Sequence, residues 1–203
     1  MKIAIAESLL KSMSYIKYRK FVSDQLALGK VTGDMQTPEL VHYTLLNETR
    51  MNRLDKKVII PEDNIQKLLN LKKEYAWLVI AEGWCGDVAQ LLPVLNKLAM
   101  ITPHIEMKIV FRDDNPKLMN LFLTNGARSI PKLIVLDNNT KDILGHWGPR
   151  PKPATDLVKS YRDQYGKIDD TIKTELQLWY LRDKGLTTQD EVISLMRDLD
   201  QRR

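Results

Sequence analysis

The sequence predicts an α/β fold, with a central mixed sheet that has helices on both faces and helical extensions at both ends of the chain. Between residues 76 and 165, strand-like apolar segments alternate with helical ones, and the last two strands follow each other directly. Outside this region, apolar residues recur only at helical spacing. We therefore expect an N-terminal helical extension over 1–75, an α/β domain over 76–165 and a C-terminal helical pair over 166–203 that packs on the domain.

Composition narrows the class of protein. The 203 residues, of which 43% are hydrophobic and 28% charged, are typical of a soluble globular protein with one sizeable core. The chain has no run of ~18 apolar residues that could span a membrane, and its first residues lack the apolar core of a secretory signal. The net charge of +5 is spread thinly among acidic residues, which favours a solvated surface. We expect a cytoplasmic protein with neither nucleic acid nor membrane as partner.

The N-terminal extension should consist of three helices. Apolar groups at helical spacing predict the first helix over residues 7–28. Thr37 followed by Pro38 predicts a capped helix from 38 to about 54, and Pro61 begins the third. Because these helices are amphipathic, they should pack on the domain or form the surface of a homodimer.

The remaining elements follow from changes in apolar spacing. In the tail, residues 169–203 predict two helices, the second opened by a capping box from Thr188 to Glu191. In the middle of the chain, the same patterns predict four strands and three helices. The strands are expected at 76–81, 105–111, 132–136 and 141–147, and the helices at 87–100, 116–123 and 153–165.

Cys85 is the only cysteine of the chain, which excludes an internal disulfide and any cysteine-cluster metal site. It follows the buried strand at 76–81 and begins a helix. Backbone N–H groups at a helix N-terminus stabilise an anion, so this position favours a thiolate. The common fate of a lone cysteine is to be a small buried hydrophobe. The position favours a reactive thiol over that fate.

Several motifs around Cys85 are similar to those of the thioredoxin superfamily. The segment Trp84-Cys85-Gly86-Asp87 resembles the family's Trp-Cys-Gly-Pro-Cys motif. Four further pieces occur in the family's order, namely Pro93 in the following helix, the turn at 112–116, the segment 126–133 that would carry a cis-proline, and Gly148. The resemblance covers about residues 76–165 and implies a thioredoxin-like fold.

The resemblance also implies a site. Cys85 would be the catalytic nucleophile, and the Ile130–Pro131 bond would be cis and face the sulfur, leaving backbone groups that can pair with an extended peptide. The expected substrate groove is lined by Trp84, Gly86, Asp87, Ile130, Pro131, Trp147 and Gly148.

Three positions depart from the family pattern. Val88 replaces the second cysteine, so dithiol reductase chemistry is excluded. Asp87 replaces a proline, and its carboxylate near Cys85 should raise the pKa of the thiol. We favour a helix cap over an acid–base catalyst as the role of Asp87. Val79 stands where the family has a buried aspartate, and Glu82, nearer the cysteine, could instead serve as a proton acceptor.

Two functions remain open at this point. The first is a monothiol thioredoxin-like protein, in which Cys85 exchanges with a disulfide or forms a mixed disulfide that an external thiol resolves. Its partner would be a protein thiol or disulfide, or a small thiol, and no cofactor is expected beyond a low-molecular-weight thiol as co-substrate. The alternative is a redox-inactive thioredoxin-fold module that binds proteins. No metal is expected, because the spacing of His42, His104 and His146 matches no metal site.

Overall fold

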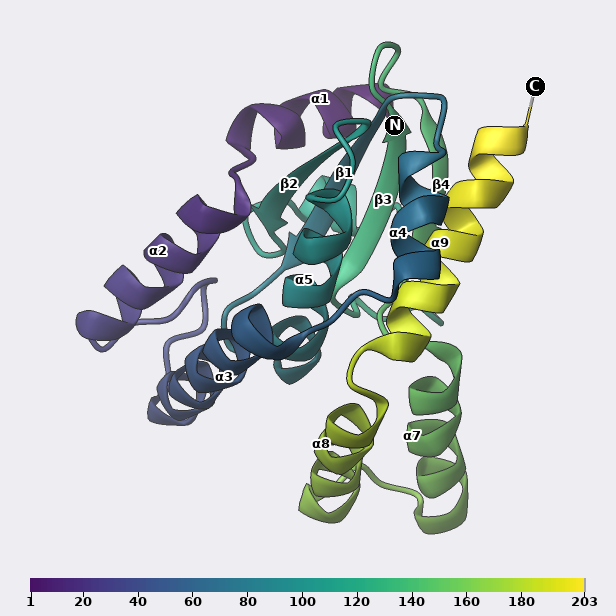
Figure 1. Cartoon of the computed structure of the whole chain (residues 1–203). Coiled ribbons are helices and arrows are strands. Elements are labelled where there is room, and N and C mark those ends of the chain that lie inside the picture. Colours follow the sequence, from purple (N-terminus) through teal and green to yellow (C-terminus); the bar gives the residue numbers. More distant parts are fainter. Residues whose placement is uncertain (203) are drawn as a thin grey trace.

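The computed structural model describes residues 1–202, which are built around a four-stranded mixed sheet (Figure 1). The strand order is β2-β1-β3-β4, with β1 parallel to β2 and the two other pairs antiparallel. The strands are β1 Tyr75–Ala81, β2 Ile105–Phe111, β3 Lys132–Asp137 and β4 Ile143–Trp147. The predicted α/β class and mixed sheet are confirmed.

Strand β1 is central because its sequence is apolar on both faces. All seven of its residues are buried, and it has hydrogen-bonded neighbours on both sides. Val79, for example, is opposite Ile109 of β2 and Leu133 of β3. A strand buried on both faces has no alternation of apolar and polar residues, and this explains the continuous apolar run.

Nine helices surround the sheet in the described part of the chain. They are α1 Lys2–Lys11, α2 Tyr15–Ala27, α3 Pro38–Lys57, α4 Glu62–Leu69, α5 Gly86–Ala99, α6 Pro116–Met119, α7 Lys152–Tyr165, α8 Asp170–Asp183 and α9 Leu186–Gln201. Thr37 caps α3 as predicted, because its side chain accepts a hydrogen bond from the Leu40 N–H at 3.2 Å.

Helices lie on both sides of the sheet. On one side α9 packs against β4, where Leu195 and Leu199 contact Gly145 closely enough that a larger residue would crowd them, and α9 also contacts α5. On the other side, the turn after α6 places Phe122 edge-on to His146, with 5.6 Å between the ring centroids. Helices α1 and α2 cover the β2 edge.

The prediction of one helix over residues 7–28 is wrong, because the chain forms α1 and α2 with a break between them. Met13, in the break, pairs with Ile109 of β2 through two backbone hydrogen bonds of 2.9 and 2.8 Å. These bonds partly cover the exposed edge of the sheet. Ser14 then caps α2 by accepting the Lys17 N–H. Apolar spacing alone does not reveal this break.

The predicted capping box is also wrong, because α9 begins at Leu186 and Thr188 is fully buried inside it. The helix starts at Gly185, whose φ of +81° places it in the left-handed region that glycine favours. The Asp183 carboxylate accepts the Thr187 N–H at 3.2 Å and so satisfies a free donor of the first turn.

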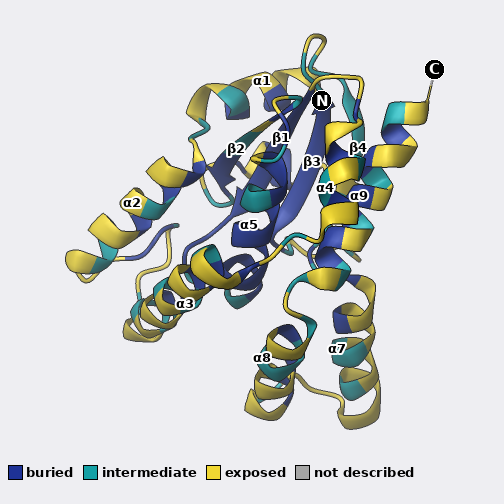
Figure 2. Ribbon diagram, in the orientation of Figure 1, coloured by how far each residue is buried: buried dark blue, intermediate teal, exposed yellow. Residues whose placement is uncertain are grey.

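The helical extensions share one core with the sheet. Side chains from the N-terminal helices, such as Tyr18 and Val22, and from α9, such as Val192 and Met196, are buried in the same cluster as β1. In Figure 2, β1 and β3 are coloured as buried, whereas the outer helices are exposed over much of their length. The indole N–H of Trp77 in β1 points at the sulfur of Met196, 3.3 Å away. The division of the chain at residues 75 and 165 stays a prediction.

Among residues 1–202, no helix is both long and apolar enough to cross a membrane.

Candidate functional site

Cys85 lies where the chain leaves β1 and enters α5. It is the N-cap residue of α5, and its backbone N–H donates to the Glu82 carbonyl at 3.2 Å. Its Sγ donates to the Ile130 carbonyl oxygen, 3.5 Å away. The peptide bond between Ile130 and Pro131 is cis, as expected. The structure therefore brings the thiol and the cis-proline turn together, although 45 residues separate them in sequence.

The N-terminal extension holds the segment that precedes Cys85. The Thr32 hydroxyl accepts the Gly83 N–H at 2.9 Å, and the amide of Asn47, from α3, donates to the Gly83 carbonyl at 2.9 Å. The indole N–H of Trp84 donates to the Thr32 carbonyl at 3.1 Å. The Arg112 guanidinium lies 4.8 Å from the centre of the Trp84 ring, a cation–π contact. Trp84 is thus fixed by backbone and side-chain contacts.

A cavity of about 380 Å³ opens beside Cys85. Four residues of the predicted site line it, namely Trp84, Cys85, Gly86 and Asp87. Helices α3 and α8 supply most of the remaining wall, which comprises Glu39, Leu40, Tyr43, Asn47, Arg50, Arg150, Lys173, Leu176 and Gln177. The cavity is therefore formed between the sheet domain and both helical extensions.

The other predicted groove residues lie outside this cavity. Ile130 and Pro131 are buried behind the sulfur. Gly148 is packed against the same turn, since a Cβ added to it would meet the Pro131 carbonyl oxygen at 2.5 Å. The half-buried Trp147 donates its indole N–H to Glu191 of α9 at 2.7 Å.

Asp87 is the most unusual residue of the site. Its side chain is nearly buried, with an Oδ2–Arg150 distance of 2.7 Å, and its Oδ1 accepts the Tyr180 hydroxyl at 2.8 Å. The interpretation of Asp87 as a helix cap is wrong, because its carboxylate binds these two side chains and no cap hydrogen bond from a side chain is present at α5. Arg150 and Tyr180 come from the chain after β4 and from α8, so the tertiary fold overrides the local capping preference.

Burial raises the pKa of the Cys85 thiol to about 12, and the Asp87 carboxylate adds to this increase. Three groups lower this pKa, namely the backbone N–H groups of Val88 and Asp87 and the Arg150 guanidinium. Their effect is smaller than the increase caused by burial and Asp87. At neutral pH the thiol is therefore protonated. The helix N-terminus alone does not stabilise a thiolate here.

Glu82 is fully buried and is not one of the residues that line the cavity. Its Oε1 accepts the Asp113 N–H at 3.0 Å, while its Oε2 has no hydrogen-bond partner. Burial raises the pKa of this carboxyl group to about 7. A role for Glu82 as proton acceptor stays a prediction.

The sequence gives no sign of several residues at the site. Arg150, Tyr180, Gln177 and Arg50 lie far from Cys85 in the chain, in segments interpreted only as flanking helices or loops. No local motif marks them, because their role depends on how α3 and α8 pack beside α5.

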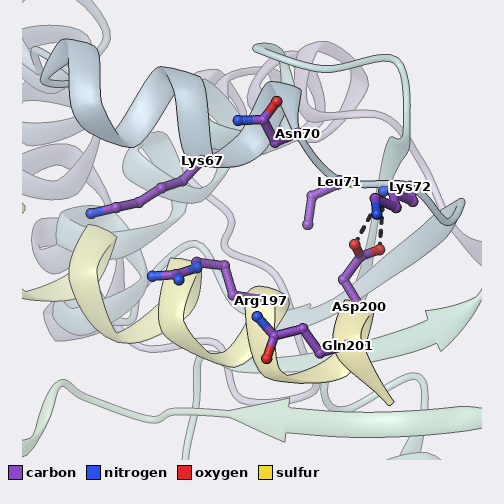
Figure 3. Close-up of a pocket in the computed structure, with 7 residues that line it drawn as sticks. All are labelled: Lys67, Asn70, Leu71, Lys72, Arg197, Asp200 and Gln201. Atoms are coloured by element: carbon purple, nitrogen blue, oxygen red, sulfur yellow. Dashed lines mark hydrogen bonds between the residues drawn. The ribbon is translucent and has the colours of Figure 1, made fainter. Parts of the chain in front are cut away.

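A larger cavity, of about 530 Å³, lies between α4 and the end of α9, and Figure 3 shows the residues around it. None of these residues belongs to the site predicted around Cys85. Asp200 accepts backbone N–H groups from Lys72 and Lys73 and the hydroxyl of Tyr75, so it fixes the start of β1. No group of three potential metal ligands occurs in the part of the chain that the structure describes.

Comparisons with known proteins complete the description. No curated protein matches the chain. Among solved structures, an HIV epitope scaffold matches with a TM-score of 0.56 and 20% identity, over 87% of this chain and 97% of that one. A protein of unknown function from Pseudomonas aeruginosa matches with a TM-score of 0.51 and 16% identity, over 88% of this chain and 93% of that one. At such identities these two likenesses show the fold alone.

The family follows from a sequence comparison. A model of the thioredoxin family matches residues 33–163, well over half of the chain. The match includes α3, which sequence analysis placed in the N-terminal extension, as well as Cys85 and the cis-proline turn. The chain belongs to the thioredoxin family.

Proposed function

We propose that the protein is a thioredoxin-family module that binds a partner at the Cys85 site and does not turn over as a redox enzyme. The observation that carries this proposal is the Asp87 carboxylate, buried beside the thiol in an ion pair with Arg150. A fixed negative charge in that place opposes a thiolate, and the thiolate is the form that attacks disulfides.

The position of the second cysteine supports the same proposal. Val88 is only 1% exposed and belongs to the hydrophobic core. Its side chain packs with the sheet, so the position has become structural. The site has a cavity and a cis-proline turn, both of which suit the binding of a partner. It has no second cysteine that could complete a redox cycle.

Monothiol exchange is the second candidate function, and one observation favours it: the half-buried Cys85 lines the cavity and its sulfur faces the cis-proline turn. In this reaction the Cys85 thiolate attacks one sulfur of a partner disulfide. A mixed disulfide forms and the other sulfur leaves as a thiolate. An external thiol then attacks the partner's sulfur in the mixed disulfide, which releases the Cys85 thiolate and leaves the partner joined to the external thiol by a disulfide. Glu82 would be the acceptor of the Cys85 proton.

A disulfide-exchange assay separates the two candidates. The protein and a Cys85→Ser variant are incubated at pH 7.5 with 2-hydroxyethyl disulfide, followed by reduced glutathione, and intact mass is measured over time. We expect slow, substoichiometric adduct formation on the wild-type protein and no catalytic turnover. Rapid adduct formation with repeated turnover, absent in Cys85→Ser, would establish monothiol exchange and overturn the binding proposal.

A further inference from the structure

Three neighbouring cavities form a row that leads away from Cys85 along α3 and α8. The cavity beside Cys85 shares Arg50 and Gln177 with a second cavity of about 270 Å³. The second cavity shares Arg53 and Leu181 with a third, of about 330 Å³, that ends at Lys184. We call this row of three cavities the basic groove. Its walls are α3 and α8, which lie near the same end of α5 in Figure 1.

The length of the basic groove exceeds that of a small thiol. It follows α3, a helix of 20 residues, which is ~30 Å long at ~1.5 Å of rise per residue. An extended polypeptide covers ~3.4 Å per residue, so about nine residues would fill it.

The second and third cavities of the basic groove carry positive charge that no lining carboxylate balances. Four basic side chains line these two cavities without a salt bridge among the described residues, namely Arg50, Arg53, Lys57 and Lys184. Burial lowers the pKa of Arg50, and the charge of Arg53 adds to this decrease. Two guanidinium groups therefore repel each other in a place where an anion would relieve the repulsion.

Apolar side chains lie between these charges. Leu54 is buried and Leu178 half-buried in the groove, while Leu181 is 51% and Ile59 77% exposed. A small inorganic anion would leave this apolar surface in water. A polypeptide that carries both acidic and apolar side chains matches both features.

We propose that the basic groove binds an extended, acidic and partly apolar segment of a partner protein, one end of which reaches the cavity beside Cys85. This proposal rests on the proposed function, because it names the chemical class of the partner. Acidic side chains would pair with Arg50 and Arg53 in the middle of the groove, and apolar ones would cover Leu181.

Peptide binding tests this proposal. The probe is a fluorescein-labelled 12-residue peptide of alternating glutamate and leucine, and its anisotropy is measured with the full-length protein at low and at moderate salt. The reference peptide has lysine in place of glutamate. We expect the acidic peptide to bind and the basic one not to bind. The double variant Arg50→Glu/Arg53→Glu should weaken binding by about tenfold or more at low salt.

A matched control distinguishes local recognition from net charge. Lys17 and Lys159 are exposed on α2 and α7, away from the groove, so Lys17→Glu/Lys159→Glu makes the same change in net charge. We expect this variant to change the affinity by less than about twofold, because exposed distant charges are screened by salt. Equal weakening in both double variants would overturn the proposal.

Competition experiments test whether phosphate or nucleic acid occupies the groove instead of a peptide. Full displacement of the peptide by ~1 mM inorganic phosphate, or tighter binding of a 12-nucleotide single strand, would overturn the proposal. Failure of the proposed function would appear separately, as fast disulfide exchange at Cys85, whatever the affinity of the peptide.

Discussion

The charge beside the sulfur decides what Cys85 can do. A cysteine at the N-cap of a 14-residue helix is in a position that commonly lowers a thiol pKa. Here burial and the Asp87 carboxylate together outweigh that effect. Because Asp87 is held by Arg150 and Tyr180, it cannot turn away from the site without losing both contacts.

Asp87→Asn should therefore make Cys85 more reactive. The substitution removes the carboxylate and leaves the Arg150 guanidinium, which favours a thiolate. At pH 8 the thiolate fraction rises about tenfold for each pH unit by which the pKa falls, and the rate of alkylation by iodoacetamide rises with it. Asp156→Asn, which removes an exposed carboxylate on α7, is the control and should leave the rate unchanged. An unchanged rate in Asp87→Asn would contradict the role of Asp87.

The raised pKa of Glu82 predicts that the stability of the protein depends on pH. Its pKa is about 7 in the folded protein, against a value of 4.5 without the burial. Between these two values the folded state binds a proton that the unfolded state has released, so the free energy of unfolding falls as pH rises. The loss is complete about one unit above the folded-state pKa, near pH 8.

Glu82→Gln removes that loss, because glutamine carries no charge at either pH. Relative to the wild type, the variant should gain up to ~3 kcal/mol in free energy of unfolding between pH 5 and pH 8. Urea denaturation at both pH values measures this, with Glu106→Gln on the exposed surface as control. If variant and wild type differ by the same free energy of unfolding at both pH values, the pKa of Glu82 is not raised in the folded protein.

At the scale of elements, the loop after β4 is fitted against the cis-proline turn. Gly148 has a φ of +108°, and a side chain there would meet the Pro131 carbonyl oxygen. Gly126 also has a positive φ, of +78°, but has open space around it. A larger residue would be strained by the positive φ at either position. Only at position 148 would its side chain also clash with a neighbouring atom.

Gly148→Ala should therefore destabilise the protein by at least ~2 kcal/mol more than Gly126→Ala, because only the first adds a clash to the strain. Urea unfolding of both variants gives the comparison. Equal losses of stability would mean that the loop and the turn are not closely packed.

The elements differ in how well the sequence predicts them. The four strands and the start of α3 follow from apolar runs and a local cap, and the structure agrees with them. The break at Met13 and the start of α9 were missed, because backbone pairing with β2 and the left-handed Gly185 determine them. In the site, Cys85 and the cis-proline turn were expected from motifs. Arg150 and Tyr180 could not be expected, since they reach Asp87 only through tertiary packing.

At the scale of the whole molecule, the helical extensions complete the thioredoxin-family domain. The α2–α3 loop and α3 hold the Gly83–Trp84 segment, and α8 provides Tyr180 for Asp87. The main core joins α1, α2, α3 and α9 to the sheet, and α7 and α8 pack with α5 in a second, smaller cluster. The site and the basic groove therefore exist only in the full chain.

A chain ending at residue 165 should not fold into the native structure. It lacks Val192, Ile193, Met196 and Leu199, all buried against the rest of the core, and each buried side chain contributes ~1.5–3 kcal/mol. Their sum is comparable to the whole stability of a typical domain. Circular dichroism and a thermal melt measure the outcome. Cooperative unfolding at the wild-type temperature would show that the tail is dispensable.

The central claim is that Cys85 is a protonated, slowly reacting thiol in a binding site. Its most direct test is the rate of iodoacetamide alkylation from pH 6 to pH 10, followed by intact mass. Because Cys85 is the only cysteine, the adducts that form on the wild-type protein and not on Cys85→Ser report on this residue. We predict a slow reaction whose rate still rises at pH 10, with an apparent pKa above ~8.5, the value of a free thiol. A plateau reached below that pH, with fast labelling at pH 7, would contradict the claim and favour monothiol redox chemistry.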